Sequence, residues 1–230
     1  MSTIDLVIAR YNESLDFLDK EPFVSNVHFR RILYNKGNPI ESTKFYKYHE
    51  LANVGKCDHT YLHHIVENYD TLGEITLFVP GSCMDVDYKI KKTVETIERM
   101  NKTQKTTMFG FFISGLASVA QFQLNTWESS SIENKTLNQG ESKLTPSEIR
   151  PFGKWYQSMF GRNQDLHFIC YNGIFAIHRN DILQHPKSFY QTLLHQVETC
   201  INPEVGHYIE RSWVTIFGPL SILSLHVFIL

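Results

Sequence analysis

The amino-acid sequence predicts an α/β fold, a single-domain α/β/α sandwich around a mostly parallel central sheet. Short apolar runs that end in turn residues, such as residues 4–9 and 75–79, are typical of buried strands. Segments with apolar side chains at 3.6-residue spacing lie between such runs and are typical of helices. At 230 residues the chain suits one domain over 1–230. Because strands and helices alternate, we expect parallel strands covered on both faces.

In the first half of the chain the alternation is regular. The predicted elements, in order, are a strand at 4–9, a short helix at 15–18, a strand at 29–34, a helix at 58–69, a strand at 75–79 and a helix at 86–100. Asn12 or Ser14 is expected to cap the short helix, and Asp58 the next one. The segment 45–51 has a mixed pattern that favours no element.

The second half is less regular. The apolar segment 109–119 contains Gly and Ser, and its pattern does not decide between helix and strand. Residues 125–147 are polar without periodicity, which indicates a surface loop. One or two strands are predicted at 166–178, followed by helices at 186–200 and 205–217.

The C-terminal segment 219–230 is strongly apolar. It is too short for a membrane-spanning helix, which needs about 20 residues. We therefore expect a packed terminal element or a surface for a partner, with a homodimer as a hypothesis. A membrane-peripheral role is the alternative, because an exposed apolar patch of that size needs a reason.

Composition and charge exclude several classes of protein. The net charge of −2 argues against general binding of nucleic acid. The four cysteines form no CxxC pair, which favours free thiols in a reducing compartment. The N-terminus lacks the pattern of a signal peptide, so we expect a cytoplasmic protein with no transmembrane span. The motifs GxxxxGK[ST], GxGxxG and GxSxG are missing, which disfavours P-loop enzymes, dehydrogenases and α/β-hydrolases.

Candidate functional residues follow the predicted strands, because ligands of open α/β sheets bind beyond the carboxyl ends of the strands. The loops in question are 10–13, 35–37 and 81–87. Asp85 and Asp87 could share one Mg²⁺ or Mn²⁺ ion, since these cations favour oxygen ligands. Alternatively, Asp85 caps the following helix and Asp87 favours its positive end. The pattern leaves both interpretations open.

Two helices carry further candidates. His207 and Glu210 stand at i and i+3, so they could share a metal or act as ligand and base. From spacing alone, a surface Glu–Arg pair beside a core Trp is favoured over that site. His59 and His63, at i and i+4, are a weaker candidate metal pair without an evident third ligand.

Several segments together resemble a known family. They are Leu-Val-Ile-Ala-Arg-Tyr-Asn-Glu at 6–13, Ile-Leu-Tyr-Asn-Lys-Gly at 32–37, Asn-Val-Gly-Lys at 53–56, His-Thr-Tyr-Leu-His-His-Ile at 59–65, Asn-Tyr-Asp at 68–70, Gly-Ile-Phe-Ala at 173–176, Phe-Tyr at 189–190 and Gly-His-Tyr-Ile-Glu-Arg-Ser-Trp at 206–213. In order and spacing they are similar to DUF3431, an uncharacterised family of fungi and of glycosyltransferase-like proteins in large algal viruses. The resemblance implies the GT-A fold of nucleotide-diphospho-sugar transferases.

The resemblance also implies a set of site residues. The nucleotide-binding residues would be Ala9, Arg10, Tyr11, Asn35, Lys36, Asn53, Gly55 and Lys56. A divalent cation, Mn²⁺ or Mg²⁺, would be held by Asp85 and Asp87, with His207 as a third ligand. Glu210 would be the catalytic base that an inverting transferase needs, with Asp165 as its substitute.

The function expected from the resemblance is transfer of a sugar from a UDP- or GDP-sugar to a glycan or glycoprotein acceptor. If the protein is virus-encoded, it would act in the host cytoplasm. Two alternatives are another metal-dependent enzyme that processes nucleotides and a non-catalytic relic of the fold that binds sugar or protein.

Overall fold

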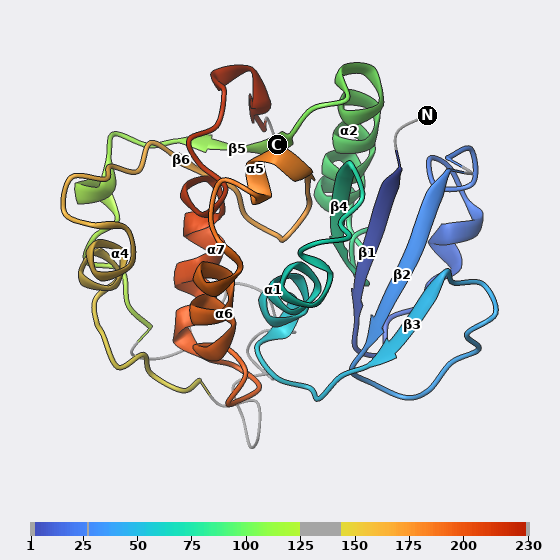
Figure 1. The fold of residues 1–230 in the computed structure, drawn as a ribbon, viewed down its shortest axis with the longest axis horizontal. Coiled ribbons are helices and arrows are strands. Elements are labelled where there is room, and N and C mark those ends of the chain that lie inside the picture. Colours follow the sequence, from blue (N-terminus) through green and yellow to red (C-terminus); the bar gives the residue numbers. More distant parts are fainter. Residues whose placement is uncertain (1–2, 27, 125–143, 229–230) are drawn as a thin grey trace.

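The computed structural model describes residues 3–26, 28–124 and 144–228 (Figure 1). Its centre is an eight-stranded mixed sheet of order β3-β2-β1-β4-β7-β5-β6, with β8 paired to β5. The strands are β1 (Ile4–Arg10), β2 (Phe29–Asn35), β3 (Lys47–Glu50), β4 (Ile75–Pro80), β5 (Thr107–Phe112), β6 (Phe168–Ile169), β7 (Phe175–His178) and β8 (Leu225–Val227). The predicted α/β class and the strands at 4–9, 29–34 and 75–79 are therefore confirmed.

The sheet has a parallel part and an antiparallel part. β1 pairs in parallel with β2 and β4, and β2 with β3. β7 joins β4 in the antiparallel direction, and β5 and β6 extend this part, while β8 runs parallel to β5. The order of the parallel strands reverses at β1, since the chain builds β2 and β3 on one side of it and β4 on the other. Such a reversal is where α/β sheets bind ligands.

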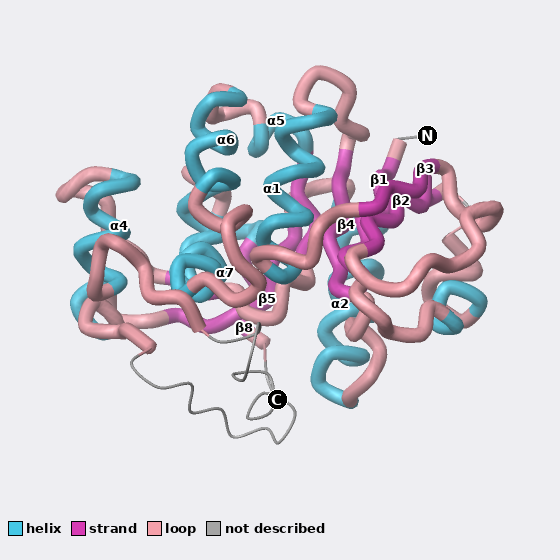
Figure 2. The backbone as a smooth tube through the Cα atoms, turned by 90° about the horizontal axis from the view of Figure 1, so that it is seen from below, coloured by secondary structure: helices cyan, strands magenta, loops and turns pink. Residues whose placement is uncertain are grey.

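Helices cover both faces of this sheet. They are α1 (Lys56–Asn68), α2 (Asp87–Thr103), α4 (Phe152–Phe160), α5 (Arg179–Ile182), α6 (Lys187–His195) and α7 (Glu204–Ile216). The side chains of β1 alternate between the two faces: Leu6 and Ile8 share a core with residues of α2, whereas Val7 shares a core with α1 and α7. Figure 2 shows α1 and α2 on opposite sides of β4.

Two predicted helix caps are corrected by the structure. α1 is preceded by Gly55 at φ 56°, and Asp58 lies inside its first turn, so Asp58 is not the N-cap. The short helix is a 3-10 turn, Asp16–Asp19, preceded by Leu15. The Oγ of Ser14 accepts a hydrogen bond from the backbone N of Asp16 (3.2 Å), so its side chain does support this turn.

The segments without a clear pattern are now assigned. Residues 109–119 contain the end of β5 and a 3-10 turn, Leu116–Ser118. The apolar C-terminal segment forms a 3-10 turn, Ile222–Ser224, and β8, which pairs with β5. It is packed only in part, because Phe228 is buried whereas Ile222, Leu223 and Val227 are exposed. Residues 125–143 of the predicted loop lie outside the described residues. No helix of the described ranges is both long and apolar enough to cross a membrane.

Candidate functional site

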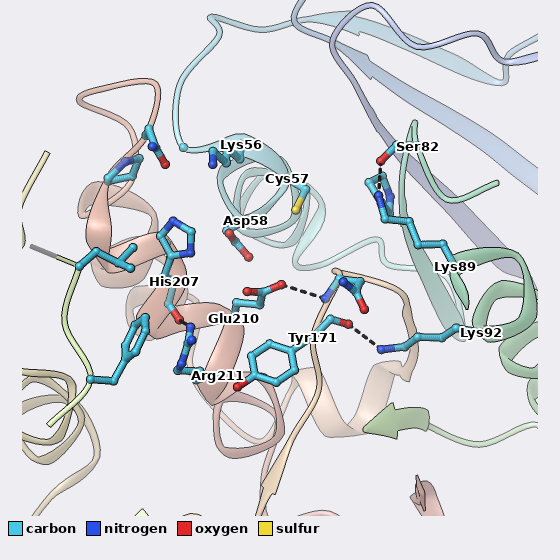
Figure 3. Close-up of a pocket in the computed structure, with 18 of the residues that line it drawn as sticks. Lys56, Cys57, Asp58, Ser82, Lys89, Lys92, Tyr171, His207, Glu210 and Arg211 are labelled. Carbon is cyan, nitrogen blue, oxygen red and sulfur yellow. Dashed lines mark hydrogen bonds between the residues drawn. The ribbon is translucent and has the colours of Figure 1, made fainter. Parts of the chain in front are cut away.

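A cleft of about 830 Å³ opens beyond the carboxyl end of β4 (Figure 3). Pro80 lines it from the end of β4, Ser82 from the loop after this strand, and Gly55 and Lys56 from the start of α1. α2 and α7 supply the two side walls, with Lys89 and Glu210 among their lining residues. The cleft therefore lies at the carboxyl end of a parallel strand, the edge at which open α/β sheets bind ligands.

The α2 wall presents two ammonium groups one helical turn apart. Lys89 Nζ donates a hydrogen bond to the Oγ of Ser82 (2.9 Å). Lys92 is 2% exposed, and its Nζ donates to the carbonyl oxygen of Tyr171. Because each ammonium is held by an uncharged acceptor, neither positive charge is neutralised by the partner that holds it.

The α7 wall carries His207, Glu210 and Arg211. Glu210 Oε1 accepts a hydrogen bond from the backbone N of Asn172 (2.8 Å), which fixes the carboxylate in the cleft. Arg211 Nη1 donates to the carbonyl oxygen of His207 (2.8 Å), and its guanidinium lies 3.5 Å from the centroid of the Phe122 ring. Burial, together with the charges of Lys56 and Arg211, lowers the pKa of His207 to about 3, so this imidazole is neutral.

The start of α1 closes the cleft between these walls. Asp58 is 7% exposed, and burial, followed by the charge of Glu210, raises its pKa well above the usual value. Asp58 therefore favours its neutral, protonated form. Burial also lowers the pKa of Lys56, and nearby acidic groups, Glu210 among them, partly offset this decrease. Figure 3 shows Asp58 and Glu210 between Lys56 on one side and Lys89 and Lys92 on the other.

The balance of charge in the cleft is positive. Its lining includes four cationic side chains and two carboxyl groups, which are Lys56, Lys89, Lys92, Arg211, Asp58 and Glu210. The chain as a whole has a net charge of −2, so the excess of cations is local to the cleft. A cleft of this kind attracts anionic ligands. Five aromatic rings complete the lining: Tyr88, Phe111, Phe122, Tyr171 and Phe228.

The amino-acid sequence matches a protein family over most of its length. The family described as "Protein of unknown function (DUF3431)" matches residues 6–224. The chain belongs to the DUF3431 family. The match spans every residue that lines the cleft except Phe228. A search of curated proteins found no match.

Only part of the nucleotide site expected of this DUF3431 chain lines the cleft. Gly55 and Lys56 do so. Arg10 is buried, and its guanidinium donates to the Oδ1 of Asn35 (2.6 Å) and the carbonyl oxygen of Asn38 (2.9 Å). Lys36 Nζ donates to the carbonyl oxygens of Val54 (2.6 Å) and Lys56. Arg10 therefore holds the loops after β1 and β2 together. Lys36 joins the loop after β2 to the start of α1 and so helps to position Lys56.

The other members of the predicted nucleotide set lie around the same loops. Ala9 is buried in β1, and Asn35 at the end of β2 donates to the carbonyl oxygens of Gly37 (3.1 Å) and Asn38 (3.0 Å). Tyr11 is 50% exposed, and Asn53 is half-buried in the turn before α1. None of these four candidates is among the lining residues of the cleft.

The predicted metal ligands are not brought together. Asp85 and Asp87 are exposed at the start of α2 and do not line the cleft, whereas His207 does. Among the described residues, no three His, Cys, Asp or Glu side chains gather as a metal site. The N-cap of α2 is Val86 and no side chain caps it, so the capping role for Asp85 is wrong. Asp87 does lie in the first turn, where a negative charge is favoured. Metal binding by the Asp85–Asp87 pair stays a prediction.

The two predicted bases differ in position. Glu210 lines the cleft, but Asp165 does not. Asp165 Oδ1 accepts hydrogen bonds from the backbone N of Leu116 (2.7 Å) and of Leu166 (2.8 Å), and these bonds lower its pKa. Asp165 therefore anchors two loops away from the cleft.

The sequence patterns did not indicate that Asp58, Lys89, Lys92 and Arg211 are part of the site. Asp58 had been interpreted as a helix cap, although no carboxylate-to-backbone cap is present. Lys89 and Lys92 stand at i and i+3 on α2, a spacing that places them on one face. That spacing, next to the loop after a buried strand, was the signal that could have identified them.

Proposed function

We propose that this DUF3431 protein is a glycosyltransferase that moves a sugar from a nucleoside-diphosphate sugar to a glycan or glycoprotein acceptor. The observation that carries the proposal is the cleft beyond β4, in which four cationic side chains surround Asp58 and Glu210. The cations suit the diphosphate of a donor, and a carboxylate suits the proton of an acceptor hydroxyl. The volume of about 830 Å³ is sufficient for a nucleotide sugar.

The transfer reaction needs positive charge near the leaving group, and this cleft contains it. The bond between the anomeric carbon and the diphosphate oxygen breaks, and its electron pair stays on that oxygen. Negative charge therefore grows on the leaving nucleoside diphosphate. Cationic groups that are already in position stabilise such charge without reorganising, and this is often the largest contribution to catalysis. Lys56 and Arg211 line the cleft together with the two lysines of α2.

Glu210 is the group proposed to take the acceptor proton. In an inverting reaction, a new bond forms between the acceptor oxygen and the anomeric carbon, and the hydroxyl proton passes to a carboxylate. The backbone N–H of Asn172 holds Oε1 of Glu210 at 2.8 Å and so orients this carboxylate. Because Asp58 favours its protonated form, Glu210 is the carboxyl group of the cleft better suited to accept a proton. A retaining reaction would not require this base.

The aromatic lining supports a sugar or base as the uncharged part of the ligand. Tyr171 and Phe122 lie beside Arg211, whose guanidinium packs on the Phe122 ring. Rings of this kind stack on the apolar faces of sugars and nucleobases. The resemblance also implies Mn²⁺ or Mg²⁺, which when bound would neutralise phosphate charge. Its expected ligands Asp85 and Asp87 lie outside the lining of the cleft, and no step of the transfer is assigned to it.

The proposal is tested by donor binding and by transfer. Titration calorimetry with UDP- and GDP-sugars, with and without Mn²⁺, is expected to identify one donor. With that donor, Glu210→Gln should retain binding and lose transfer by about 100-fold or more, the range of a missing general base. Glu98→Gln is the matched control, because Glu98 is an exposed carboxylate on α2 outside the cleft.

Two outcomes would contradict this proposal. Folded wild-type protein that binds no nucleotide or nucleotide sugar would leave the binding relic as the better explanation. Donor binding followed by equal transfer in wild type and Glu210→Gln would remove Glu210 from the mechanism. The configuration of the product, read by NMR, distinguishes an inverting from a retaining reaction in that case.

A further inference from the structure

We infer that Lys89 and Lys92 of α2 form the diphosphate subsite of the cleft and neutralise the donor's diphosphate without a divalent cation. This inference rests on the proposed function. It adds which residues bind the diphosphate of the donor and which positive charges neutralise it. It departs from the metal-assisted site that the family resemblance implies.

The two lysines lie together on one wall of the cleft. They stand at i and i+3, so their side chains leave α2 on the same face, and both line the cleft. Lys89 is bonded to Ser82 in the loop after β4, and Lys92 to the carbonyl oxygen of Tyr171 between β6 and β7. These bonds hold both ammonium groups at the carboxyl end of β4, where a donor's phosphates would lie.

The ammonium groups of Lys89 and Lys92 are also suited to donate hydrogen bonds to a phosphate. An ammonium has three N–H donors. The bond from Lys89 to the Oγ of Ser82 takes one of them and involves a neutral acceptor. The bonds from Lys92 go to a carbonyl oxygen and to the Sγ of Cys170 (3.6 Å), which are neutral too. Both lysines therefore keep their charge for an anionic ligand, and charged donors make the strongest hydrogen bonds to phosphate.

The cleft itself is a poor place for a divalent cation. The acidic pair that would bind it, Asp85 and Asp87, is exposed at the start of α2 and does not line the cleft. Of the carboxyl groups that do, Asp58 is buried and favours its neutral form, and Glu210 is engaged by Asn172. Four cationic side chains in the same lining also repel a positive ion.

The experiment is titration calorimetry of UDP, GDP and inorganic pyrophosphate, in EDTA and in Mn²⁺. We expect binding in EDTA, with dissociation constants that Mn²⁺ changes by about twofold or less. Lys89→Gln should weaken the binding of pyrophosphate and of the preferred nucleotide about tenfold, as expected for one lost charge-assisted hydrogen bond. Lys89 is the residue to change first because it is only partly buried, whereas replacing buried Lys92 endangers the fold.

The control is Lys91→Gln. Lys91 is exposed on the same helix and does not line the cleft, so this variant loses the same charge without losing the subsite. Binding that needs Mn²⁺, or equal binding by the two variants, overturns the inference. Sugar transfer that requires Mn²⁺ would also overturn the inference, but it would leave the proposed glycosyltransferase function intact. Binding of pyrophosphate in EDTA that depends on Lys89, with no transfer to any acceptor, would support the subsite and count against the transferase.

Discussion

Acidification is expected to destabilise the protein through His64, which lies on α1 at the centre of the fold. His64 is 0% exposed, and its Nδ1 is 3.0 Å from the hydroxyl oxygen of Tyr34. The rings of Tyr34 and Phe78 pack edge-on against it. Burial, and then the charge of Lys47, lowers the pKa of His64 to about 3. The imidazole is therefore neutral in the folded protein.

The sign and size of the effect follow from the two pKa values. The unfolded chain protonates His64 below its ordinary pKa of 6.5, whereas the folded protein does so only near 3. The unfolded state thus binds more protons in this window. The contribution of His64 to stability is complete above 6.5 and is lost as the pH falls toward 3. Between about pH 7.5 and about pH 5.0 the loss is about 2 kcal/mol, since each pH unit is worth about 1.4 kcal/mol.

Urea unfolding followed by circular dichroism measures this loss. The free energy of unfolding is compared at the two pH values in wild type and in His64→Phe, which fills the site with a group that does not titrate. The variant should be less sensitive to pH than wild type by about 2 kcal/mol. The control is His28→Gln, measured in the same way, because it removes a histidine that is exposed. An equal pH dependence of wild type and His64→Phe would refute the reasoning.

Two further substitutions test how the walls of the cleft are held. Glu204→Gln should lower the free energy of unfolding by about 3 kcal/mol in urea, because the buried Glu204 carboxylate pairs with Arg150 at 2.8 Å and its removal leaves a charge uncompensated. A loss below about 1 kcal/mol, the size of an exposed ion pair, would contradict this. Gly55→Ala should lower the melting temperature more than Gly161→Ala does. Both residues have positive φ, but only at Gly55 would the new Cβ lie 2.3 Å from a backbone oxygen, that of Val197. Equal decreases in the melting temperatures of the two variants would show that the surrounding structure relieves the clash at residue 55.

The loops after β1 and β2 show why charged residues near strand ends were difficult to interpret. Arg10 and Lys36 are basic and follow buried strands, as residues that bind phosphates often do. In the structure they donate instead to the carbonyl oxygens of Asn38 and Val54. A buried backbone carbonyl needs a donor as much as a ligand does, and sequence spacing does not distinguish the two. Gly55 and Lys56, one loop further, do reach the cleft.

The sequence by itself determined the type and order of the main elements. The strands at 4–9, 29–34 and 75–79 and the helices that became α1, α2, α6 and α7 were predicted because burial of one face imposes a local period of two or 3.6 residues. The i and i+3 spacing also placed His207 and Glu210 on one face of a helix, and both line the cleft, although spacing alone favoured a surface pair of Glu210 and Arg211. Membership of DUF3431 could likewise be expected from short segments in order.

Only the tertiary structure decided which side chains share the cleft. Local patterns did not reveal that β7, β5 and β6 would continue the sheet in the antiparallel direction. This arrangement places Tyr171 and Asn172 between α2 and α7, where they hold Lys92 and Glu210. Those contacts join residues 79 and 38 positions apart in the chain. Their energy depends on packing between distant elements, so no local period of the sequence records it.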